Sequence, residues 1–256
     1  MTGQDEDQTD EFDVAARWTA ESVGRLGPDH AIPAACRGSG GPGALAWLAQ
    51  WLLGGPGTAL LDVGGGVGGP AAWAMEHHGA RPVLAEPMLG AVRAARHLFD
   101  LPAVVAPGER LPLADGSFPA AWSLGVLDTT PDKAGLLAEL HRVLVPGGRA
   151  GLVAYVAGGP VPDAPEGNEF PTGTELRALL DGAGLAVVET VPVADLPDDP
   201  PAWKRRDRRV QDDIEARHGD DERWKRARAD EDKVAELLAD GRVTAHAVRL
   251  EATSRR

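Results

Sequence analysis

Short apolar runs alternate with helix-forming segments along most of the chain. The runs at 58–63, 82–85, 103–106, 119–124 and 149–156 predict buried strands. The segments 70–78, 88–99 and 131–143, which lie between strands, predict helices. Strands that alternate with helices in this way favour a parallel sheet.

The spacing of apolar residues in the N-terminal quarter of the chain predicts helices rather than strands. Residues 1–10 are acidic and polar, so we expect them to be disordered. A helical face follows and ends before Gly27-Pro28; it is formed by Phe12, Ala15, Ala16, Ala20 and Val23. Residues 29–43 are rich in Gly, Pro and Ala and predict a loop. Residues 44–53 carry leucines and tryptophans at helical spacing, which indicates a largely buried helix.

The C-terminal part returns to strands after a long interruption. The segment 158–171 is unusually long for a connection between strand and helix, and such loops are often functional or mobile. Thr172 and Glu175 form a capping-box pattern that begins the next helix. Residues 185–193 predict a sixth strand. Residues 202–240 predict two charged helices that divide near Gly219, with apolar faces made of Trp203, Val210 and Ile214 and of Val234, Leu237 and Leu238.

Residues 243–250 alternate weakly and predict a final antiparallel strand, which completes a single-domain arrangement. We expect an α/β fold with a Rossmann-like, seven-stranded, mostly parallel sheet, an antiparallel last strand and helices on both faces. Residues 11–256 would form one domain. Its parts would be an N-terminal helical lid at 11–55, a core at 56–195, a helical insertion at 200–240 and the last strand at 242–252.

Composition narrows the functional classes. The net charge of −13 argues against a duplex nucleic-acid partner, because neutralising phosphates requires a basic surface. One cysteine, Cys36, excludes an internal disulfide and fits a reducing compartment. No apolar run reaches the ~18 residues of a membrane span. The acidic N-terminus lacks the features of a signal peptide, so we expect a cytoplasmic protein.

A glycine-rich turn links the first predicted strand to the helix that begins at Pro70. Two cofactor classes use such a turn. Gly64, Gly66 and Gly69 satisfy the dinucleotide fingerprint, whereas Asp62 with Gly64, Gly66 and Gly68 satisfies the pattern of S-adenosylmethionine enzymes. Both classes expect an acid at the end of the second strand to bind ribose hydroxyls, and Glu86 supplies it. The turn alone therefore leaves the cofactor open.

The following segments favour one class. GERLPLADGSFPAAWSLGVL at 108–127 and VLVPGG at 143–148 follow the turn and Glu86 in order. With them the chain resembles the class I S-adenosylmethionine-dependent methyltransferases, and most closely the small-molecule branch that includes the ubiquinone and menaquinone C-methyltransferases. The resemblance covers residues 60–156 and, more loosely, continues to 189.

The resemblance implies a cofactor site for S-adenosylmethionine. Asp62 and the loop of Gly64, Gly65, Gly66 and Gly68 would hold its methionine part. Glu86 would bind the ribose, and the remaining contacts would come from Pro87, Met88, Gly108, Glu109, Ser123 and Leu124. Many relatives have Asp-Ala before the acid that corresponds to Glu109, and that Asp binds the adenine amino group. Here Pro107-Gly108 stands instead, so the contact must move to Glu109 or to the backbone.

Residues after the fourth and fifth strands are the catalytic candidates, because ligands bind beyond the carboxyl ends of strands in open α/β sheets. Asp128 and Tyr155 would line the acceptor pocket; alternatively Asp128 caps a helix and Tyr155 only packs. His30 in the N-terminal loop is a further catalytic candidate, or else an exposed turn residue. Arg37 would bind the methionine carboxylate or a substrate anion, or else be solvated.

No metal site is expected, because His77, His78 and His141 fall on helices that cover the sheet. The sequence therefore predicts methyl transfer from S-adenosylmethionine to a small molecule by in-line displacement, in a monomer or homodimer. Three alternatives remain. One is an NAD(P)-dependent oxidoreductase with the same turn, and another is a methyltransferase fold recruited to another reaction. The third is a non-catalytic binding or scaffold subunit, against which the intact glycine turn and Glu86 argue. The acceptor and the atom methylated stay open.

Overall fold

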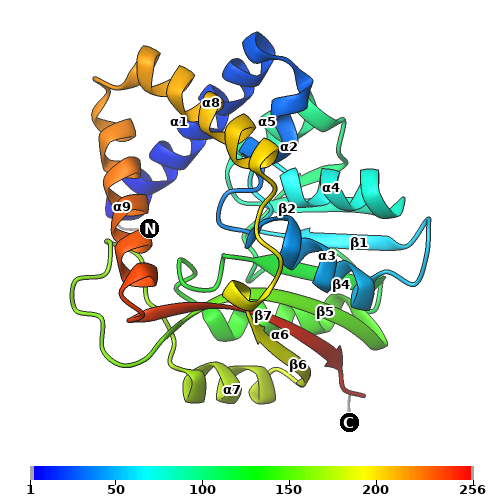
Figure 1. Cartoon of the computed structure of the whole chain (residues 1–256). Helices are drawn as coiled ribbons and strands as arrows, with labels where there is room; N and C mark the ends of the chain where they lie inside the picture. The colour runs from blue at the N-terminus through cyan, green and yellow to red at the C-terminus, as the bar shows by residue number, and fades with distance from the viewer. Residues whose placement is uncertain (1–2, 255–256) are drawn as a thin grey trace.

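A single seven-stranded sheet organises the chain, as the computed structural model shows (Figure 1). The structure describes residues 3–254, with side chains from residue 11 onward. The strands lie in the order β3-β2-β1-β4-β5-β7-β6. Their bounds are Ala59–Val63 for β1, Arg81–Glu86 for β2, Ala103–Val105 for β3, Phe118–Leu124 for β4, Leu144–Ala157 for β5, Leu185–Pro192 for β6 and Val243–Ala252 for β7.

The strand directions confirm the predicted fold class. Strands β1 to β5 run parallel, and β7 is antiparallel to both β5 and β6. One boundary differs from the prediction: β5 begins at Leu144 rather than at 149, because Leu144 already pairs with Phe118 before an irregularity in the ladder. The predicted start missed this pair because the Pro-Gly-Gly segment that follows it is typical of a turn.

Helices cover both faces of the sheet. Their bounds are Gly3–Leu26 for α1, Ala31–Ala35 for α2, Gly41–Leu52 for α3, Gly69–His78 for α4, Leu89–Phe99 for α5, Lys133–Val143 for α6, Gly173–Gly182 for α7, Pro201–His218 for α8 and Glu222–Ala239 for α9. Two 3-10 turns, η1 at Pro28–His30 and η2 at Val193–Asp195, complete the order.

Alternation along β1 separates the two core layers. Leu61 and Val63 pack with leucines of α6 and α7 on one face. Leu60 packs on the opposite face with α3 and α4. Successive side chains of a strand point to opposite faces, so Asp62 lies on the same face as Leu60. Asp62 therefore faces the side of the sheet that α3 and α4 cover.

The N-terminal region differs from the sequence prediction in two places. Helix α1 already begins at Gly3, so residues 3–10 continue a helix where we expected a disordered tail, and residues 1–2 lie outside the described part. The apolar face of residues 14–23 packs against the rest of the molecule, and a helix anchored there can extend into a polar segment. Residues 29–43, predicted as a loop, contain η1, α2 and the first turn of α3.

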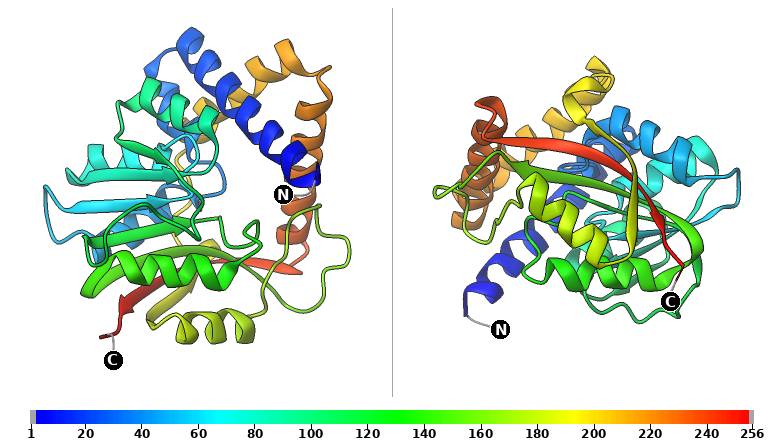
Figure 2. Two further views of the ribbon diagram at one scale, coloured as in Figure 1. Left: turned by 180° about the vertical axis from the view of Figure 1, so that it is seen from behind. Right: turned by 90° about the horizontal axis from the view of Figure 1, so that it is seen from below.

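The helical insertion lies against the N-terminal helix. Val210 and Ile214 of α8 share a buried cluster with Trp18 of α1 and Trp224 of α9. Trp224 was absent from the predicted faces, while Phe12, which was included, is exposed. In Figure 1, α1, α8 and α9 stand beyond the edge of the sheet at which β1, β2 and β4 end. The view from behind in Figure 2 shows α1 crossing this end of the molecule beside α9, with which it is in contact.

The long loop between β5 and α7 returns to the body of the molecule. Its end is paired with β5 through the N–H of Ala157, which donates to the carbonyl of Pro171 at 2.9 Å. The predicted capping box is present at Thr172 and Glu175. None of the helices in the described part of the chain is long and apolar enough to span a lipid bilayer.

Candidate functional site

The glycine turn after β1 leaves bare backbone at the carboxyl end of the sheet. Gly64, Gly66 and Gly68 have φ values of 71°, 55° and 86°, which L side chains rarely adopt. The N–H of Gly64 donates to the carbonyl of Ala85 at 2.7 Å and ties the turn to β2. A Cβ added to Gly66 meets no atom within 4 Å, so this position borders open space. A ligand can approach the main chain closely there.

The other glycines of the turn are required by internal packing. A Cβ on Gly65 would collide with Leu84 and Asp62, and one on Gly68 would collide with Leu101. At Gly69 the added atom would strike the main chain of residues 35 and 36. The structure therefore places the end of α2 directly over the start of α4. Residues 35 and 36, which belong to the segment predicted as a lid, thus lie against the glycine turn.

Glu86 bridges the turn and the segment after β2. Its Oε2 accepts the N–H of Gly66 at 2.9 Å, and its Oε1 accepts the N–H of Met88 at 3.0 Å. Burial raises the pKa of Glu86, and the two backbone N–H groups partly oppose that rise. Each carboxylate oxygen keeps further acceptor capacity. The predicted contact, in which ribose hydroxyl groups donate to this carboxylate, stays a prediction.

Asp62 is buried without a hydrogen-bonding partner within residues 3–254. Neither carboxylate oxygen makes a hydrogen bond. Burial raises its pKa to about 7; the nearby Trp122 indole and Ala71 amide oppose this rise, and the charge of Glu86 adds to it. An unpaired buried carboxylate is costly unless a cationic or donor group satisfies it. The pair of oxygens therefore fits a cationic ligand group at the glycine turn.

The remaining predicted cofactor residues lie along the same edge of the sheet. Met88 packs beneath α1 with Ala16 and Ala20, while Pro87 is exposed. Gly108 leaves no room for a side chain because Leu136 occupies that space. The others are a half-buried Glu109, a buried Ser123 whose hydroxyl has no partner among the described residues, and a buried Leu124. Their cofactor contacts remain predictions.

Arg37 is engaged with the helical insertion. It forms an ion pair with Glu231 of α9, and partial burial lowers its pKa to about 10, opposed by the charge of Asp207. This ion pair links the loop after α2 to α9. The role predicted for Arg37, binding of the methionine carboxylate or a substrate anion, stays a prediction. In that role Arg37 would have to share its guanidinium between Glu231 and the ligand, or release Glu231.

His30 is buried in the η1 turn. Its Nδ1 lies 3.2 Å from the carbonyl oxygen of Gly27, three residues earlier. The η1 turn packs against α8 and α1. The interactions described for His30 thus join it to its own turn, and its catalytic role stays a prediction.

Asp128 and Tyr155, the other two catalytic candidates, are brought together. Burial raises the pKa of Tyr155 to about 12, and the negative charge of Asp128 adds to the rise. The Tyr155 hydroxyl donates to the carbonyl of Gly38 at 3.2 Å, so the loop after α2 closes over this side of the site. Burial raises the pKa of Asp128 to about 6, opposed by its own backbone N–H, by Asn168 and by Lys133.

Trp122 and Gly125 belong to the site but were not among the predicted site residues. Trp122 is the register partner of Asp62 across β1 and β4. Gly125 directly follows β4, and a Cβ there would strike the carbonyl of Gly38 and touch the Tyr155 ring. Gly125 could have been found from its position in the sequence, because it directly follows β4 as Gly64 directly follows β1.

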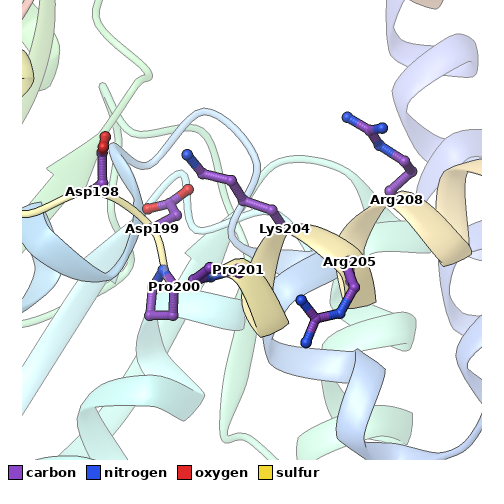
Figure 3. Close-up of a pocket in the computed structure, with 7 residues that line it drawn as sticks. All are labelled: Asp198, Asp199, Pro200, Pro201, Lys204, Arg205 and Arg208. Atoms are coloured by element: carbon purple, nitrogen blue, oxygen red, sulfur yellow. The ribbon is translucent and has the colours of Figure 1, made fainter.

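A separate hollow lies at the start of α8 (Figure 3). Acidic, basic and proline side chains line it: Asp198, Asp199, Pro200, Pro201, Lys204, Arg205 and Arg208. None of the predicted site residues is among them. In Figure 3 Lys204 and Arg208 extend to one side of the helix and Arg205 to the other, as expected for a solvated charged helix.

Comparisons with known proteins agree with this geometry. Residues 61–152 match the family model described as a methyltransferase domain. The chain is 32% identical over 161 residues to methyltransferase GfsG of Streptomyces halstedii, which covers 54% of this chain and 56% of that protein. It is 36% identical over 101 residues to demethylmenaquinone methyltransferase of Corynebacterium urealyticum, which covers 39% of this chain and 43% of that protein. The chain thus spans about half the length, or less, of the curated relatives it matches.

Solved structures share the fold at low sequence identity. The cyclase SpnF superposes with a TM-score of 0.64 and 22% identity, covering 82% of this chain and 80% of SpnF. Geranyl diphosphate C-methyltransferase of Streptomyces coelicolor A3(2), solved with Mg²⁺, geranyl diphosphate and S-adenosyl-L-homocysteine, gives a TM-score of 0.59 and 18% identity, covering 82% of this chain and 78% of that enzyme.

Proposed function

Since this chain carries a domain of the S-adenosylmethionine-dependent methyltransferase family, we propose that it transfers a methyl group from S-adenosylmethionine to a small organic molecule. The observation that carries the proposal is the pairing of Asp62 with the bare backbone at Gly66. A sulfonium or ammonium group fits the unpaired carboxylate, and the open space at Gly66 admits a ligand beside the main chain. The family relationship also favours this cofactor over a nicotinamide dinucleotide.

The chain's own groups would bind and orient the reactants. The glycine turn and Asp62 would hold the methionine part, and Glu86 would hold the ribose. S-adenosylmethionine supplies an activated methyl group, so the protein has to align the reacting atoms and exclude water. Orientation of this kind is worth ~7–11 kcal/mol. The loop after α2, which contacts Gly69, Gly125 and Tyr155, would exclude water.

The acceptor would bind between the ends of β4 and β5. Asp128, which is buried, and Tyr155, which is half-buried, lie there, and the charge of Asp128 acts on the Tyr155 hydroxyl. Asp128, with its pKa near 6, is suited to take up a proton near neutral pH. We therefore assign Asp128 the role of proton acceptor and Tyr155 the role of lining the pocket, with the small-molecule class of acceptor taken from the relatives.

Glu86→Gln tests the cofactor site. The variant keeps the side chain's size but loses a charged acceptor, so we expect the affinity for S-adenosylhomocysteine to fall about 10- to 100-fold, as for one hydrogen bond to a charged group. Isothermal titration calorimetry measures it, with Glu76→Gln on the exposed face of α4 as the matched control. Equal affinities in the two variants would remove Glu86 from the site.

A second candidate function is another reaction on the same fold, because the structural neighbour SpnF is a cyclase. Incubation of the purified chain with methyl-labelled S-adenosylmethionine and a metabolite extract of its source organism distinguishes methyl transfer from another reaction. A labelled small-molecule product is the expected result. Tight binding of the cofactor without any labelled product would favour the second candidate.

A further inference from the structure

The loop between β5 and α7 folds back onto Asp128, which lies in the segment after β4. Asn168, the only asparagine of the chain, donates from Nδ2 to Oδ2 of Asp128 at 2.7 Å. The next residue, Glu169, donates its backbone N–H to the carbonyl of Asp128 at 2.8 Å. Two adjacent loop residues thus contact both the side chain and the main chain of one distant residue.

The loop is anchored on either side of Asn168. The backbone N–H of Asn168 donates to the carbonyl of Pro165 at 3.0 Å. Lys133 donates from Nζ to Glu169 at 3.1 Å. Phe170 is buried with Leu237 of α9 and residues of β5 and β7. Because its neighbours are fixed, the Asn168 amide has little freedom to leave Asp128.

The contact leaves Asp128 with one engaged and one unengaged oxygen. Asp128 is buried, and its Oδ1 makes no hydrogen bond to any residue in the described part of the chain. An amide donor is neutral, so it orients the carboxylate without the strong stabilisation of the anion that an arginine would give. Lys133, whose charge also lowers the pKa of Asp128, already donates to Thr130 and Glu169. The arrangement holds the carboxylate in place and lowers its pKa less than a hydrogen bond from a cation would.

We propose that Asn168 is a positioning residue that orients Asp128 so that its free oxygen accepts the proton lost by the methyl acceptor. The inference rests on the proposed function and extends it to the loop at 158–171. As the acceptor atom forms its bond to the methyl carbon, the carbon–sulfur bond breaks and its electron pair remains on sulfur. The acceptor's proton passes to Oδ1 of Asp128. The products are the methylated acceptor, S-adenosylhomocysteine and protonated Asp128.

Asn168→Leu tests the proposal without knowledge of the acceptor. Leucine matches asparagine in shape but donates no hydrogen bond, and the bond stabilises the ionised carboxylate. We therefore expect the pKa of Asp128 to rise by about one unit. It is measured by ¹³C NMR of carboxyl-labelled aspartate, with the resonance assigned by Asp128→Asn. Glu166→Gln, at an exposed position of the same loop, is the control and should leave the pKa unchanged.

The outcomes separate this inference from the proposed function. An unchanged Asp128 pKa in Asn168→Leu would overturn the positioning role. Asn168→Asp provides a second variant of the same size if the leucine variant does not fold, and it should raise the pKa further through like-charge repulsion. Titration with S-adenosylhomocysteine reports on the cofactor site independently. Its failure to bind the unmodified chain would overturn the proposed function while the pKa comparison still tests the contact.

Discussion

At the scale of single residues, the site is defined by carboxylates that burial keeps from ionising easily. Asp62 lies within β1, Glu86 ends β2 and Asp128 follows β4, and the three are only 1%, 2% and 4% exposed. The pKa of each is raised, chiefly by desolvation. Buried acids of this kind reduce stability and therefore concentrate at sites where a ligand or a proton satisfies them.

Asp62 gives a pH dependence of stability. Its pKa rises from an ordinary 3.8 to about 7 on folding, so between these values the folded state holds a proton that the unfolded chain has lost. The contribution of Asp62 to the free energy of unfolding therefore decreases as pH rises through this window. Asp62→Asn removes the effect. Relative to the unmodified chain, we expect the variant to gain ~2–3 kcal/mol between pH 5 and pH 8.

Urea denaturation of the chain and of Asp62→Asn at both pH values measures this gain. Asp212→Asn, an exposed aspartate of α8, is the control and should show no such change. A stability difference between Asp62→Asn and the unmodified chain that is the same at pH 5 and pH 8 would contradict the raised pKa.

Gly66→Val tests whether the open space at the turn holds the cofactor. The added side chain enters that space, so we expect binding of S-adenosylhomocysteine to be lost. Gly57→Val is a matched control, because Gly57 also has a positive φ, 84°, and no atom within 4 Å of an added Cβ, but precedes β1. Calorimetry on both variants, with thermal melts to confirm folding, separates blocked binding from backbone strain. Normal binding of S-adenosylhomocysteine by Gly66→Val would show that the cofactor does not occupy the space at this turn.

At the scale of elements, short connections place the functional groups. The turn between β1 and α4 supplies the bare backbone, and the loop between β5 and α7 supplies Asn168. That loop is terminated by the capping box, in which Thr172 Oγ1 accepts the N–H of Glu175 at 3.3 Å and Glu175 accepts the N–H of Thr172 at 2.8 Å. The cap therefore fixes where the loop ends and α7 begins.

Thr172→Ala should destabilise the start of α7. Loss of an N-cap side chain costs about 1 kcal/mol. For a chain of this size we expect the melting temperature to fall by about 2–4 °C in a thermal melt followed by circular dichroism. Thr174→Ala makes the same chemical change at an exposed position in the first turn of the helix and is the control. Equal melting temperatures for the two variants would show that the cap contributes nothing.

At the scale of the whole molecule, helices far apart in sequence form one cover over the carboxyl ends of the strands. Ser22 and Arg25 of α1 both donate to the carboxylate of Asp213 in α8, the latter from Nε at 3.0 Å. Glu11 accepts a hydrogen bond from Arg226 of α9. The cover is therefore held by polar contacts around the buried cluster that contains Trp18 and Trp224.

Asp213→Ala should loosen this cover. Removal of a carboxylate that accepts from two α1 side chains lowers the cost of opening α1, so we expect amides of residues 11–26 to exchange hydrogen about tenfold faster. Hydrogen–deuterium exchange followed by mass spectrometry measures the rates. Asp212→Ala removes the neighbouring, exposed carboxylate and should leave them unchanged. Equal exchange in both variants would show that Asp213 does not hold α1.

Local patterns predicted most of the core. The strand of residues 58–63 and the helix of 70–78 match β1 and α4 within one residue at each end, because apolar runs and glycine turns are local signals. The proximity of Asp62 and Glu86 was also predictable from local patterns, since a strand–helix–strand unit brings the ends of its two parallel strands together. In contrast, α2 lies in a segment rich in Gly, Pro and Ala that has no helical period and is stabilised by contacts with α4 and α8.

The amino-acid sequence by itself determined the alternation of strands and helices and the glycine turn. It also determined the two acids near that turn, Asp62 in β1 and Glu86 at the end of β2. Each of these depends on residues close together in the chain. Only the tertiary structure decided that Asn168 meets Asp128, that Tyr155 meets Gly38 and that α1 joins α8 and α9 over the strand ends. Such contacts join positions from 40 to 191 residues apart, and they form only when the sheet has brought their elements together. No local pattern encodes them, because their free energy depends on packing and burial that exist only in the folded chain.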